Sequence, residues 1–436
     1  MEKIVTLVRL GIKYLYRYRR RYGFLLTALI FSFTVVTLVT SLKDGMYDNL
    51  YHTAQSHYAG DIVAMGYNTV FTQYHHLGQA EIAAILNAAE TAGIHPRHTV
   101  LRTIHFQTGI VHFNGIAVPL RYLIGSDWES EAHLFARMTF EGQPDSSPGD
   151  DGIFLSLPTA QILGARMGDS VILETETKSG QRNTGVFIVK GIVRDASIFG
   201  YYKAYISRLS LNRLMLFDDN DTSSVGFFLA SPRTAAEKRQ LLHEALAGQV
   251  HLLPLVYDRE GFASESRRFG EEPNISLYTL AVYLSEVSNM LNAMNVITYF
   301  LYGMMLLIIL VSAAVTYRLI LHERTRELGV MRAIGFYGTD LRLVLWVEVI
   351  GVGLISLAAG FALAWVLGWG VSLLSFSWFP SFEIFMKDGR LTALYLPGTM
   401  LTNVAAVFLL LFVAALFPSF RASRKNLPGL LSGEPL

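Results

Sequence analysis

The sequence contains no cysteine, and this absence excludes several kinds of chemistry. Without a thiol the chain can form no disulfide bond, no thiolate zinc site and no cysteine nucleophile. The Walker A pattern G-x-x-x-x-G-K-[ST] is also absent, so the backbone cannot cradle nucleotide phosphates in the P-loop manner. No G-x-S-x-G or H-E-x-x-H hydrolase motif is present. We therefore expect no enzymatic activity, and no cofactor bound by this chain itself.

Charge is also scarce. Charged residues make up 16% of the 436 residues, whereas hydrophobic residues make up 52%, and the mean hydropathy is +0.36. This composition is typical of a membrane protein. The net charge of +1 says nothing by itself about a nucleic-acid partner, because the charge is localised along the chain rather than general. Four long runs carry no charged residue, at 22–42, 287–317, 349–382 and 391–420.

These runs predict four transmembrane helices, because about 20 apolar residues are needed to cross a bilayer. We place the helices at 22–42, 287–321, 343–375 and 397–420. Lysine and arginine gather in the N-terminal segment 1–21, in an elbow at 322–342 and in the tail 421–436, and the positive-inside rule assigns these segments to the cytoplasm. The short loop 376–396 and the large segment 43–286 then lie outside the cytoplasm. We expect a bacterial inner-membrane protein with its large domain in the periplasm.

The N-terminal segment 1–21 has an amphipathic pattern that ends in the basic cluster Arg19, Arg20 and Arg21. Such a segment is expected along the membrane surface, with its basic side chains among lipid phosphates. The following apolar run is longer than that of a cleaved signal peptide, so we interpret it as a retained helix.

The segment 43–286 predicts an α+β domain, divided into two parts near 142–151. Apolar residues at helical spacing predict helices at 79–92, 158–165, 210–216 and 234–247. Alternating or short apolar runs between turn residues predict strands. These lie within 99–124 and at 152–156, 170–177, 184–193, 203–206, 225–230 and 250–253.

Nine of the twelve histidines fall between His52 and His133. The neighbours His75 and His76, and the pair His95 and His98, raise the possibility of a metal site. No further ligand completes a recognisable spacing, so we expect no bound metal.

Several motifs resemble the FtsX/MacB-type permeases of ABC transporters. The elbow reads E-R-T-R-E-L-G-V-M-R-A-I-G over 323–335, similar to that family's E-R-x-x-E-I-G-x-x-[RK]-A-[LI]-G signature. The C-terminal P-S-F-R-A-S-R-K-N-L-P-G-L-L at 418–431 is similar to its closing motif. The stretches S-L-K-D-G-M at 41–46 and I-L-G-A-R-M-G-D at 162–169 resemble motifs of lipoprotein-releasing (Lol) permeases. The arrangement of one helix, a large outer domain and three helices is also that of the family.

The resemblance implies a permease subunit driven by a separate cytoplasmic ABC ATPase dimer, which uses ATP and Mg²⁺. Other implied partners are a second permease copy or a paralogue, membrane lipid and a periplasmic lipoprotein carrier; nucleic acid is not among them. The expected function is lipoprotein release from the inner membrane. The alternatives are MacB-like export of a peptide, toxin or lipid, and mechanical signalling to a periplasmic enzyme.

Two sets of site residues follow from this resemblance. A short elbow helix should fit a groove on the ATPase, with Met331 and Ile334 giving it an apolar side. A transported acyl chain would need an apolar entry site between the first and second helices of opposing subunits. The ATPase-coupling residues are Arg324, Arg326, Glu327, Leu328, Gly329, Met331, Arg332, Ala333, Ile334 and Gly335, and the substrate-lining candidates are Phe31, Val35, Leu38, Met290 and Met294.

Overall fold

The computed structural model describes residues 2–17, 22–68, 73–74, 76–194, 202–258, 261, 274–376, 385–387 and 389–424. The chain divides into two compact units. Unit 1 contains residues 1–47, 291–375 and 390–436, and unit 2 contains residues 48–290 and 376–389. Each unit is therefore assembled from segments that lie far apart in the sequence.

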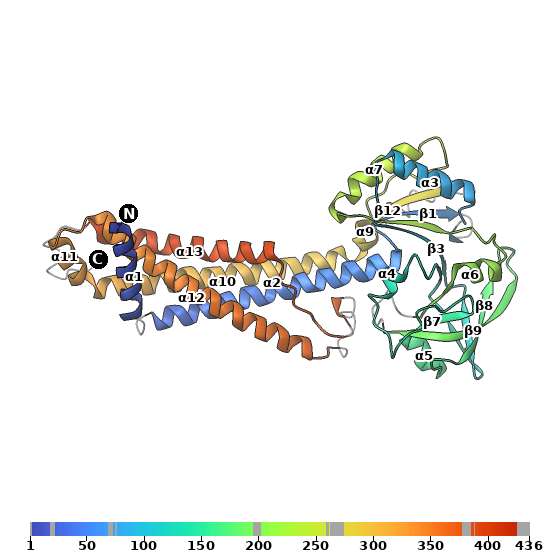
Figure 1. The fold of residues 1–436 in the computed structure, drawn as a ribbon, viewed down its shortest axis with the longest axis horizontal. Helices are drawn as coiled ribbons and strands as arrows, with labels where there is room; N and C mark the ends of the chain where they lie inside the picture. The colour runs from blue at the N-terminus through green and yellow to red at the C-terminus, as the bar shows by residue number, and fades with distance from the viewer. Residues whose placement is uncertain are drawn as a thin grey trace. The chain divides into compact units, whose positions relative to one another are not determined.

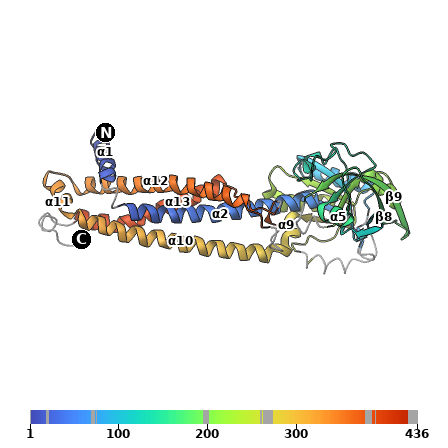
Figure 2. The same ribbon diagram turned by 90° about the horizontal axis from the view of Figure 1, so that it is seen from below.

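Unit 1 is helical, and the chain has four described helices that are long and apolar enough to cross a membrane. They are α2 (Gly23–Tyr58), α10 (Ser288–Glu323), α12 (Gly338–Leu373) and α13 (Pro397–Arg424). Two further helices, α1 (Glu2–Arg17) and α11 (Thr325–Ala333), complete the unit. In Figures 1 and 2, α1 crosses α12 near the end of the bundle where α11 lies. The expected order of one span, a large domain and three spans is confirmed.

Small residues allow three of the spans to approach closely, as is common between helices in lipid. A Cβ on Gly360 of α12 would lie 3.0 Å from Phe33 Cδ1 of α2. Thr34 of α2 donates a hydrogen bond from its hydroxyl to the Gly360 carbonyl oxygen at 3.2 Å. A Cβ on Gly353 would lie 3.1 Å from Leu411 Cδ1 of α13. Helix α12 therefore packs tightly against both α2 and α13.

The described residues of unit 2 form one twelve-stranded sheet, in the order β12-β1-β11-β3-β6-β10-β7-β9-β8-β4-β5, with β2 paired to β1. The pairs β6–β10 and β7–β9 are parallel, and the other pairs are antiparallel. The strands are β1 (Ile62–Asn68), β2 (Gln73–Tyr74), β3 (His98–Phe106), β4 (Ile110–Phe113), β5 (Ile116–Pro119), β6 (Tyr122–Ser126), β7 (Gly152–Ser156), β8 (Ser170–Glu176), β9 (Arg182–Val193), β10 (Lys203–Ser207), β11 (Ser224–Phe228) and β12 (Asn274–Thr279).

Two groups of helices cover different parts of this sheet (Figure 1). Helices α3 and α7 pack on β1, β11 and β12 through a core that includes Ile85 and Leu242. Helices α5 and α6 share a second core with β7, β8 and β9, which includes Leu163 and Leu211. The helices of unit 2 are α3 (Gln79–Thr91), α4 (Ala132–Phe135), α5 (Leu157–Leu163), α6 (Arg208–Met215), α7 (Ala235–Leu246), α9 (Leu280–Tyr283) and the 3₁₀ turns η1 (Pro232–Thr234) and η2 (Leu284–Val287).

Several observed elements differ from the sequence prediction. Helix α2 continues to Tyr58, sixteen residues past Leu42, because no proline interrupts it there and its last turns are bonded to Arg102 and Asp61. The stretch 250–253 forms isolated bridges rather than a strand, and β12 was not predicted. In the segment 142–151, Asp145 N bonds to Lys190 O of β9 at 2.9 Å, so this part of the segment lies beside the second group. The basic cluster at 19–21 and most of the tail lie outside the described residues.

Candidate functional site

The elbow is a short helix held between two spans. One residue separates α10 from α11, and four residues separate α11 from α12. Leu328 and Met331 of α11 are buried in a cluster with Leu321 of α10 and Leu341 and Leu345 of α12. The sequence places these two apolar residues three apart, so they share one helix face. That face binds α11 to its own membrane unit.

Gly335 ends α11 because it adopts a backbone conformation that side chains disfavour. Its φ is +103°, and a Cβ there would meet no atom within 4 Å, so the backbone angle rather than space requires glycine. The amides of Gly335 and Phe336 donate to the carbonyl oxygens of Arg332 and Met331, both at 3.1 Å. The last turn of α11 thus has hydrogen-bonded carbonyls, and the chain can reverse into α12.

Arg324, the residue between α10 and α11, is the buried centre of the elbow. Its side chain is only 1% exposed, and its Nη1 donates to Glu348 Oε2 of α12 at 2.7 Å. Its Nε also donates to Glu327 Oε2 at 3.4 Å, and its guanidinium carbon lies 4.6 Å from the centre of the Tyr14 ring of α1. One guanidinium therefore contacts α1, α11 and α12 together.

Glu348 extends this network to the start of α2. Its carboxylate is fully buried, and Tyr22 donates its hydroxyl hydrogen to Glu348 Oε2 at 2.5 Å. The observed partners are Arg324 and Tyr22, while Arg342 Nε donates to the Gly338 carbonyl oxygen at 3.3 Å.

The predicted coupling residues divide into buried and exposed groups. Arg324, Leu328, Gly329 and Met331 are buried, so they can only support the elbow from within. On the outer side, Val330 is 51% and Ile334 is 72% exposed, and Tyr337 after the helix is 71% exposed. Met331 and Ile334 therefore do not form one exposed apolar face. Glu327 and Arg332 are half-buried, and the remaining exposed residues are Arg326, Ala333 and Gly335.

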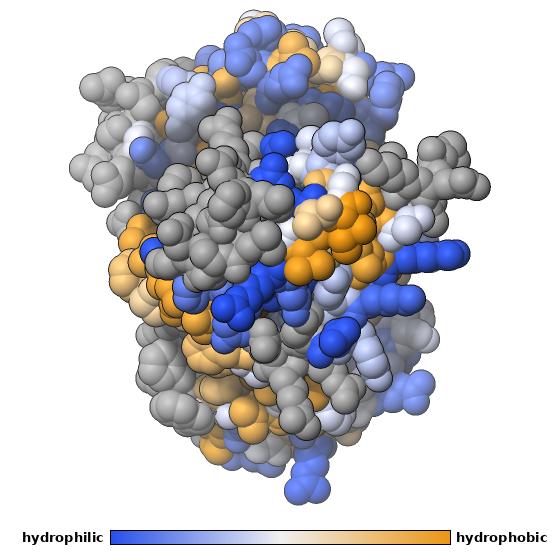
Figure 3. All heavy atoms as spheres, turned by 90° about the vertical axis from the view of Figure 1, so that its left-hand side faces the viewer, coloured by the Kyte–Doolittle hydropathy of each residue, from blue (hydrophilic) through white to orange (hydrophobic). Residues whose placement is uncertain are grey.

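Val330, Ile334 and Tyr337 form what we name the elbow surface. Figure 3 views the elbow end of the bundle, where orange hydrophobic side chains lie beside long blue hydrophilic ones. An apolar centre with a charged rim is the usual composition of a protein–protein contact. The sequence prediction included Ile334 but missed Val330 and Tyr337. Val330 could have been predicted, because it lies four residues after Arg326 and therefore on the same helix face.

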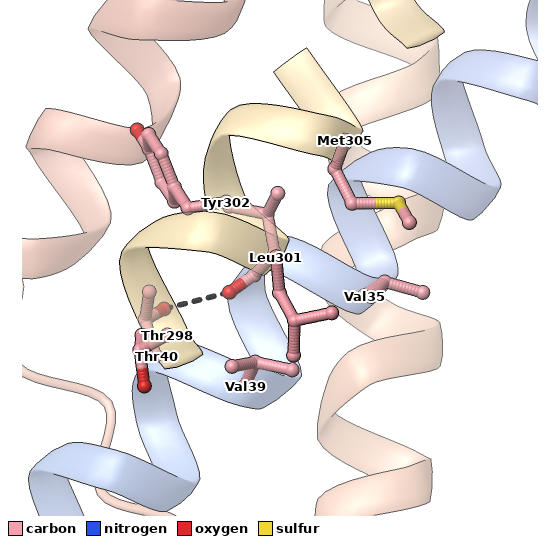
Figure 4. Close-up of a pocket in the computed structure, with 8 residues that line it drawn as sticks. Val35, Val39, Thr40, Thr298, Leu301, Tyr302 and Met305 are labelled. Carbon is pink, nitrogen blue, oxygen red and sulfur yellow. Dashed lines mark hydrogen bonds between the residues drawn. The ribbon is translucent and has the colours of Figure 1, made fainter. Parts of the chain in front are cut away.

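A narrow apolar crevice lies between α2 and α10 (Figure 4). Of the five predicted substrate-lining residues, only Val35 lines it. Phe31 is 60% exposed on α2, Leu38 and Met294 are half-buried elsewhere, and Met290 belongs to unit 2. The lining consists of Val35, Val36, Val39 and Thr40 from α2 and Thr298, Leu301, Tyr302 and Met305 from α10.

The motif at 41–46 has a packing role. A Cβ on Gly45 would lie 1.8 Å from the Thr392 carbonyl oxygen, so only glycine lets the chain before α13 pass this close to α2. Leu394 N donates to Ser41 O at 2.8 Å, and the Thr399 hydroxyl donates to Asp44 Oδ2 at 2.7 Å. These contacts fix the beginning of α13 against α2.

The histidines form pairs rather than a ligand set. His76 and His105 are buried with their Nε2 atoms 3.0 Å apart, and burial lowers the pKa of His105 to about 4. His98 stacks on His133, His95 is exposed, and His75 lies outside the described residues. Within the described part of the chain, no three His, Cys, Asp or Glu side chains are placed to hold a metal ion.

Sequence reasoning missed a second buried ionic pair, which holds the end of α2 in unit 2. Arg102 of β3 pairs with Glu131, and both side chains are fully buried. Arg102 Nη1 also donates to the carbonyl oxygens of Ser56 and His57, at 2.8 and 2.9 Å, and these belong to the last turn of α2. A cation at this position satisfies orphan carbonyls and complements the helix dipole. No sequence signal joins Arg102 to Glu131, because they are 29 residues apart.

Asp61 makes a similar connection close by. Its Oδ1 accepts hydrogen bonds from Tyr51 and Gln55 of α2, the latter at 2.9 Å. Its Oδ2 accepts one from Leu229 N, just after β11, at 2.7 Å. Together with Arg102, Asp61 ties residues 51–57 of α2 to the sheet.

Comparison with known families gives a match over the C-terminal membrane segment. Residues 299–427, which cover most of α10 and all of α11, α12 and α13, match the family of the FtsX-like permease C-terminal region. No curated protein matches the sequence. Structural similarity was found to the periplasmic region of MacB from Actinobacillus actinomycetemcomitans, with 11% identity, a TM-score of 0.31, and coverage of 54% of this chain and 96% of that one.

A domain of a candidate permease from Porphyromonas gingivalis is similar at 12% identity and a TM-score of 0.26, covering 50% of this chain and 87% of that one. Neither structural similarity is strong enough to carry a conclusion. The four candidate spans and the large α/β domain between the first and second of them fit a membrane protein with a domain outside the bilayer. Residues 299–427 are therefore similar to the C-terminal region of FtsX-like permeases, and the order of the four candidate spans agrees with this similarity.

Proposed function

We propose that this chain passes the movement of a separate ATPase dimer to its own α/β domain, and that its cargo is a lipoprotein released from the inner membrane. ATP and Mg²⁺ belong to the ATPase, and the α/β domain works in the periplasm, where it delivers cargo to a lipoprotein carrier. The second permease of the complex is another copy of this chain or a paralogue.

The buried contacts of Arg324 are the observation that carries this proposal. A push on the elbow surface reaches α12 through Glu348, α2 through Tyr22 and α1 through Tyr14. A buried ion pair with good geometry resists separation, because a lone charge in that place costs about 3–5 kcal/mol. At the other end of α2, Arg102 and Asp61 bind the helix to the sheet. Helix α2 therefore has firm polar attachments near both ends.

The elbow surface gives a direct test of ATPase docking. Ile334→Asp places a charge at the exposed apolar centre and should detach the ATPase, whereas Ile334→Val should retain it. Co-purification of the ATPase with each variant, at equal permease abundance in the membrane, measures the effect. Full ATPase retention by Ile334→Asp would show that docking occurs elsewhere.

Membrane orientation can be tested with single cysteines, because the native chain has none. Ser179→Cys, exposed between β8 and β9, should react with an impermeant reagent once the outer membrane is permeabilised. Arg326→Cys, exposed on α11, should react only after the inner membrane is opened. The opposite pattern would reverse the proposed orientation.

An acyl-chain cargo would have to separate α2 and α10 at the crevice between them, because the crevice holds no space for a water molecule and its lining of apolar side chains also includes Thr40, Thr298 and Tyr302 (Figure 4). A photocrosslinker at Leu301 should capture an acylated protein. One at Leu319, which is 57% exposed on α10 outside the crevice, should capture only lipid. If Leu301 captures no lipoprotein while the complex hydrolyses ATP, export of another cargo or signalling to a periplasmic enzyme becomes the better explanation.

A further inference from the structure

Helix α1 has one face that is used for packing. Leu7 is buried, and a Cβ on Gly11 would lie 2.8 Å from Val347 Cγ1 of α12. One turn further, Leu15 Cδ2 lies 2.8 Å from where a Cβ on Gly351 would be. Glycine on each helix thus allows close contact, and α1 is firmly seated on residues 344–351 of α12.

The other face of α1 is basic and exposed. Arg9, Lys13 and Arg17 recur every four residues and therefore form one stripe. No acidic group lies within ion-pair distance of these three among the side chains that the structure describes. Beside the stripe, Ile12 is 57% and Tyr16 is 72% exposed. Basic residues flanked by an aliphatic and an aromatic side chain are typical of a helix at a lipid surface.

The position of α1 in the chain places this stripe at the membrane boundary. Helix α2, which is long and apolar enough to span, begins at Gly23, only six residues after Arg17. Six residues reach at most about 20 Å. The segment of α12 that α1 covers also belongs to the first part of a span, between Gly338 and Gly351. Anionic headgroups are therefore the charged surface within reach of the stripe.

Tyr14 connects this helix to the elbow. It is half-buried on α1, and its ring lies 4.6 Å from the guanidinium carbon of Arg324. Arg324 in turn holds Glu348 of α12 and Glu327 of α11. Anything that presses α1 onto the unit also presses the Tyr14 ring onto the residue that organises α11.

We propose that α1 binds anionic phospholipid headgroups through Arg9, Lys13 and Arg17, and that Tyr14 transmits this contact to Arg324 and so orders the elbow helix. The proposal rests on the proposed function in that the elbow receives the ATPase. It adds a regulator, the anionic lipid content of the membrane, which would set how firmly the elbow is held for docking.

The lipid contact is tested on the full chain with its co-purified ATPase, in phosphatidylcholine vesicles with or without phosphatidylglycerol. An environment-sensitive fluorophore on Tyr16→Cys should shift to the blue when phosphatidylglycerol is present. Arg9→Ser/Lys13→Ser/Arg17→Ser in the same background should weaken the contact about a hundredfold, since each basic residue contributes about fivefold near an anionic surface. High salt should abolish the shift. An equal signal in both vesicles, or no effect of the triple substitution, would overturn the lipid contact.

The connection to the elbow is tested by hydrogen exchange of the α11 amides in the same vesicles. Phosphatidylglycerol should slow exchange in the wild type and in Tyr14→Phe, which keeps the ring over Arg324. It should not do so in Tyr14→Leu, although the Tyr16 fluorophore should still report lipid contact. Equal slowing in Tyr14→Leu would overturn the role of Tyr14. The fluorescence shift and the hydrogen exchange do not depend on ATP hydrolysis. A complex without ATPase activity would therefore refute the proposed function, while these two measurements would still decide whether lipid binding at α1 orders α11.

Discussion

Removing one partner of the Arg324–Glu348 pair should destabilise unit 1 far more than removing both. Arg324→Met leaves the Glu348 carboxylate fully buried with only the Tyr22 hydroxyl at hand, and such an uncompensated charge costs about 3–5 kcal/mol. Glu348→Met leaves Arg324 with Glu327, whose bond is longer at 3.4 Å and whose side chain is 42% exposed, so we expect a loss of about 3 kcal/mol. Arg324→Met/Glu348→Met removes both charges and should be close to neutral, within about 1–2 kcal/mol.

The two single variants and the double variant form a thermodynamic cycle with an expected coupling of about 4 kcal/mol or more. Thermal unfolding in lipid nanodiscs measures it through native tryptophan fluorescence, since Trp346 is two residues from Glu348. Arg326→Met is the matched control, because Arg326 is exposed on α11 two residues after Arg324, and it should change the free energy of unfolding by less than about 0.5 kcal/mol. The reasoning fails if the double variant loses as much stability as the two single variants summed.

Three further perturbations follow from single contacts. Gly45→Ala should displace the chain near Thr392 and lower the free energy of unfolding in nanodiscs by about 1–3 kcal/mol. The control Gly303→Ala, whose added Cβ meets no atom within 4 Å, should raise it by about 1 kcal/mol. Equal effects of the two substitutions would contradict the packing role of the motif at 41–46. Arg102→Met should cost about 3–5 kcal/mol and speed hydrogen exchange in the last turn of α2, and unchanged exchange there would refute the anchor. Burial lowers the pKa of His105 to about 4, so between pH 6.5 and 4 the unfolded chain binds a proton at this histidine more readily than the folded chain does. The free energy of unfolding should therefore fall by about 3 kcal/mol over this range. His105→Phe should reduce the dependence of the free energy of unfolding on pH, and an unchanged dependence would assign it to other groups.

The membrane architecture could be predicted from the sequence because a bilayer imposes a simple rule on composition. Charge-free runs marked all four spans, and the alternation of basic segments suggested their orientation. The end of α2 could not be predicted in this way. Its apolar run stops at Leu42, but nothing in the next residues breaks a helix, and the attachments that hold the extension come from Arg102 and Asp61.

The elbow was predicted as an element, but its side chains were not assigned correctly to the inside and outside. A motif rich in charged residues next to a membrane predicts a solvent-exposed surface, and Arg324 is part of that motif although its side chain is buried. Its burial depends on Glu348, 24 residues later, and on Tyr14, which lies on a separate helix. Such long-range pairs leave no periodic trace in one sequence. In unit 2, β12 was missed for a related reason, since its pairing with β1 joins residues more than 200 positions apart.

The Arg324–Glu348 pair also has a consequence for how the protein is made. Glu348 lies ten residues inside α12, in its first part near the membrane boundary, and a carboxylate carried there alone raises the cost of inserting the helix, by less than the roughly 2.5–3.5 kcal/mol of an aspartate at a helix centre. Arg324 emerges from the ribosome before Glu348 and is separated from it only by α11 and the first turns of α12. We expect the translocon to receive α10, α11 and α12 as a hairpin whose two charges are already paired, so that neither helix enters the lipid as an independent unit.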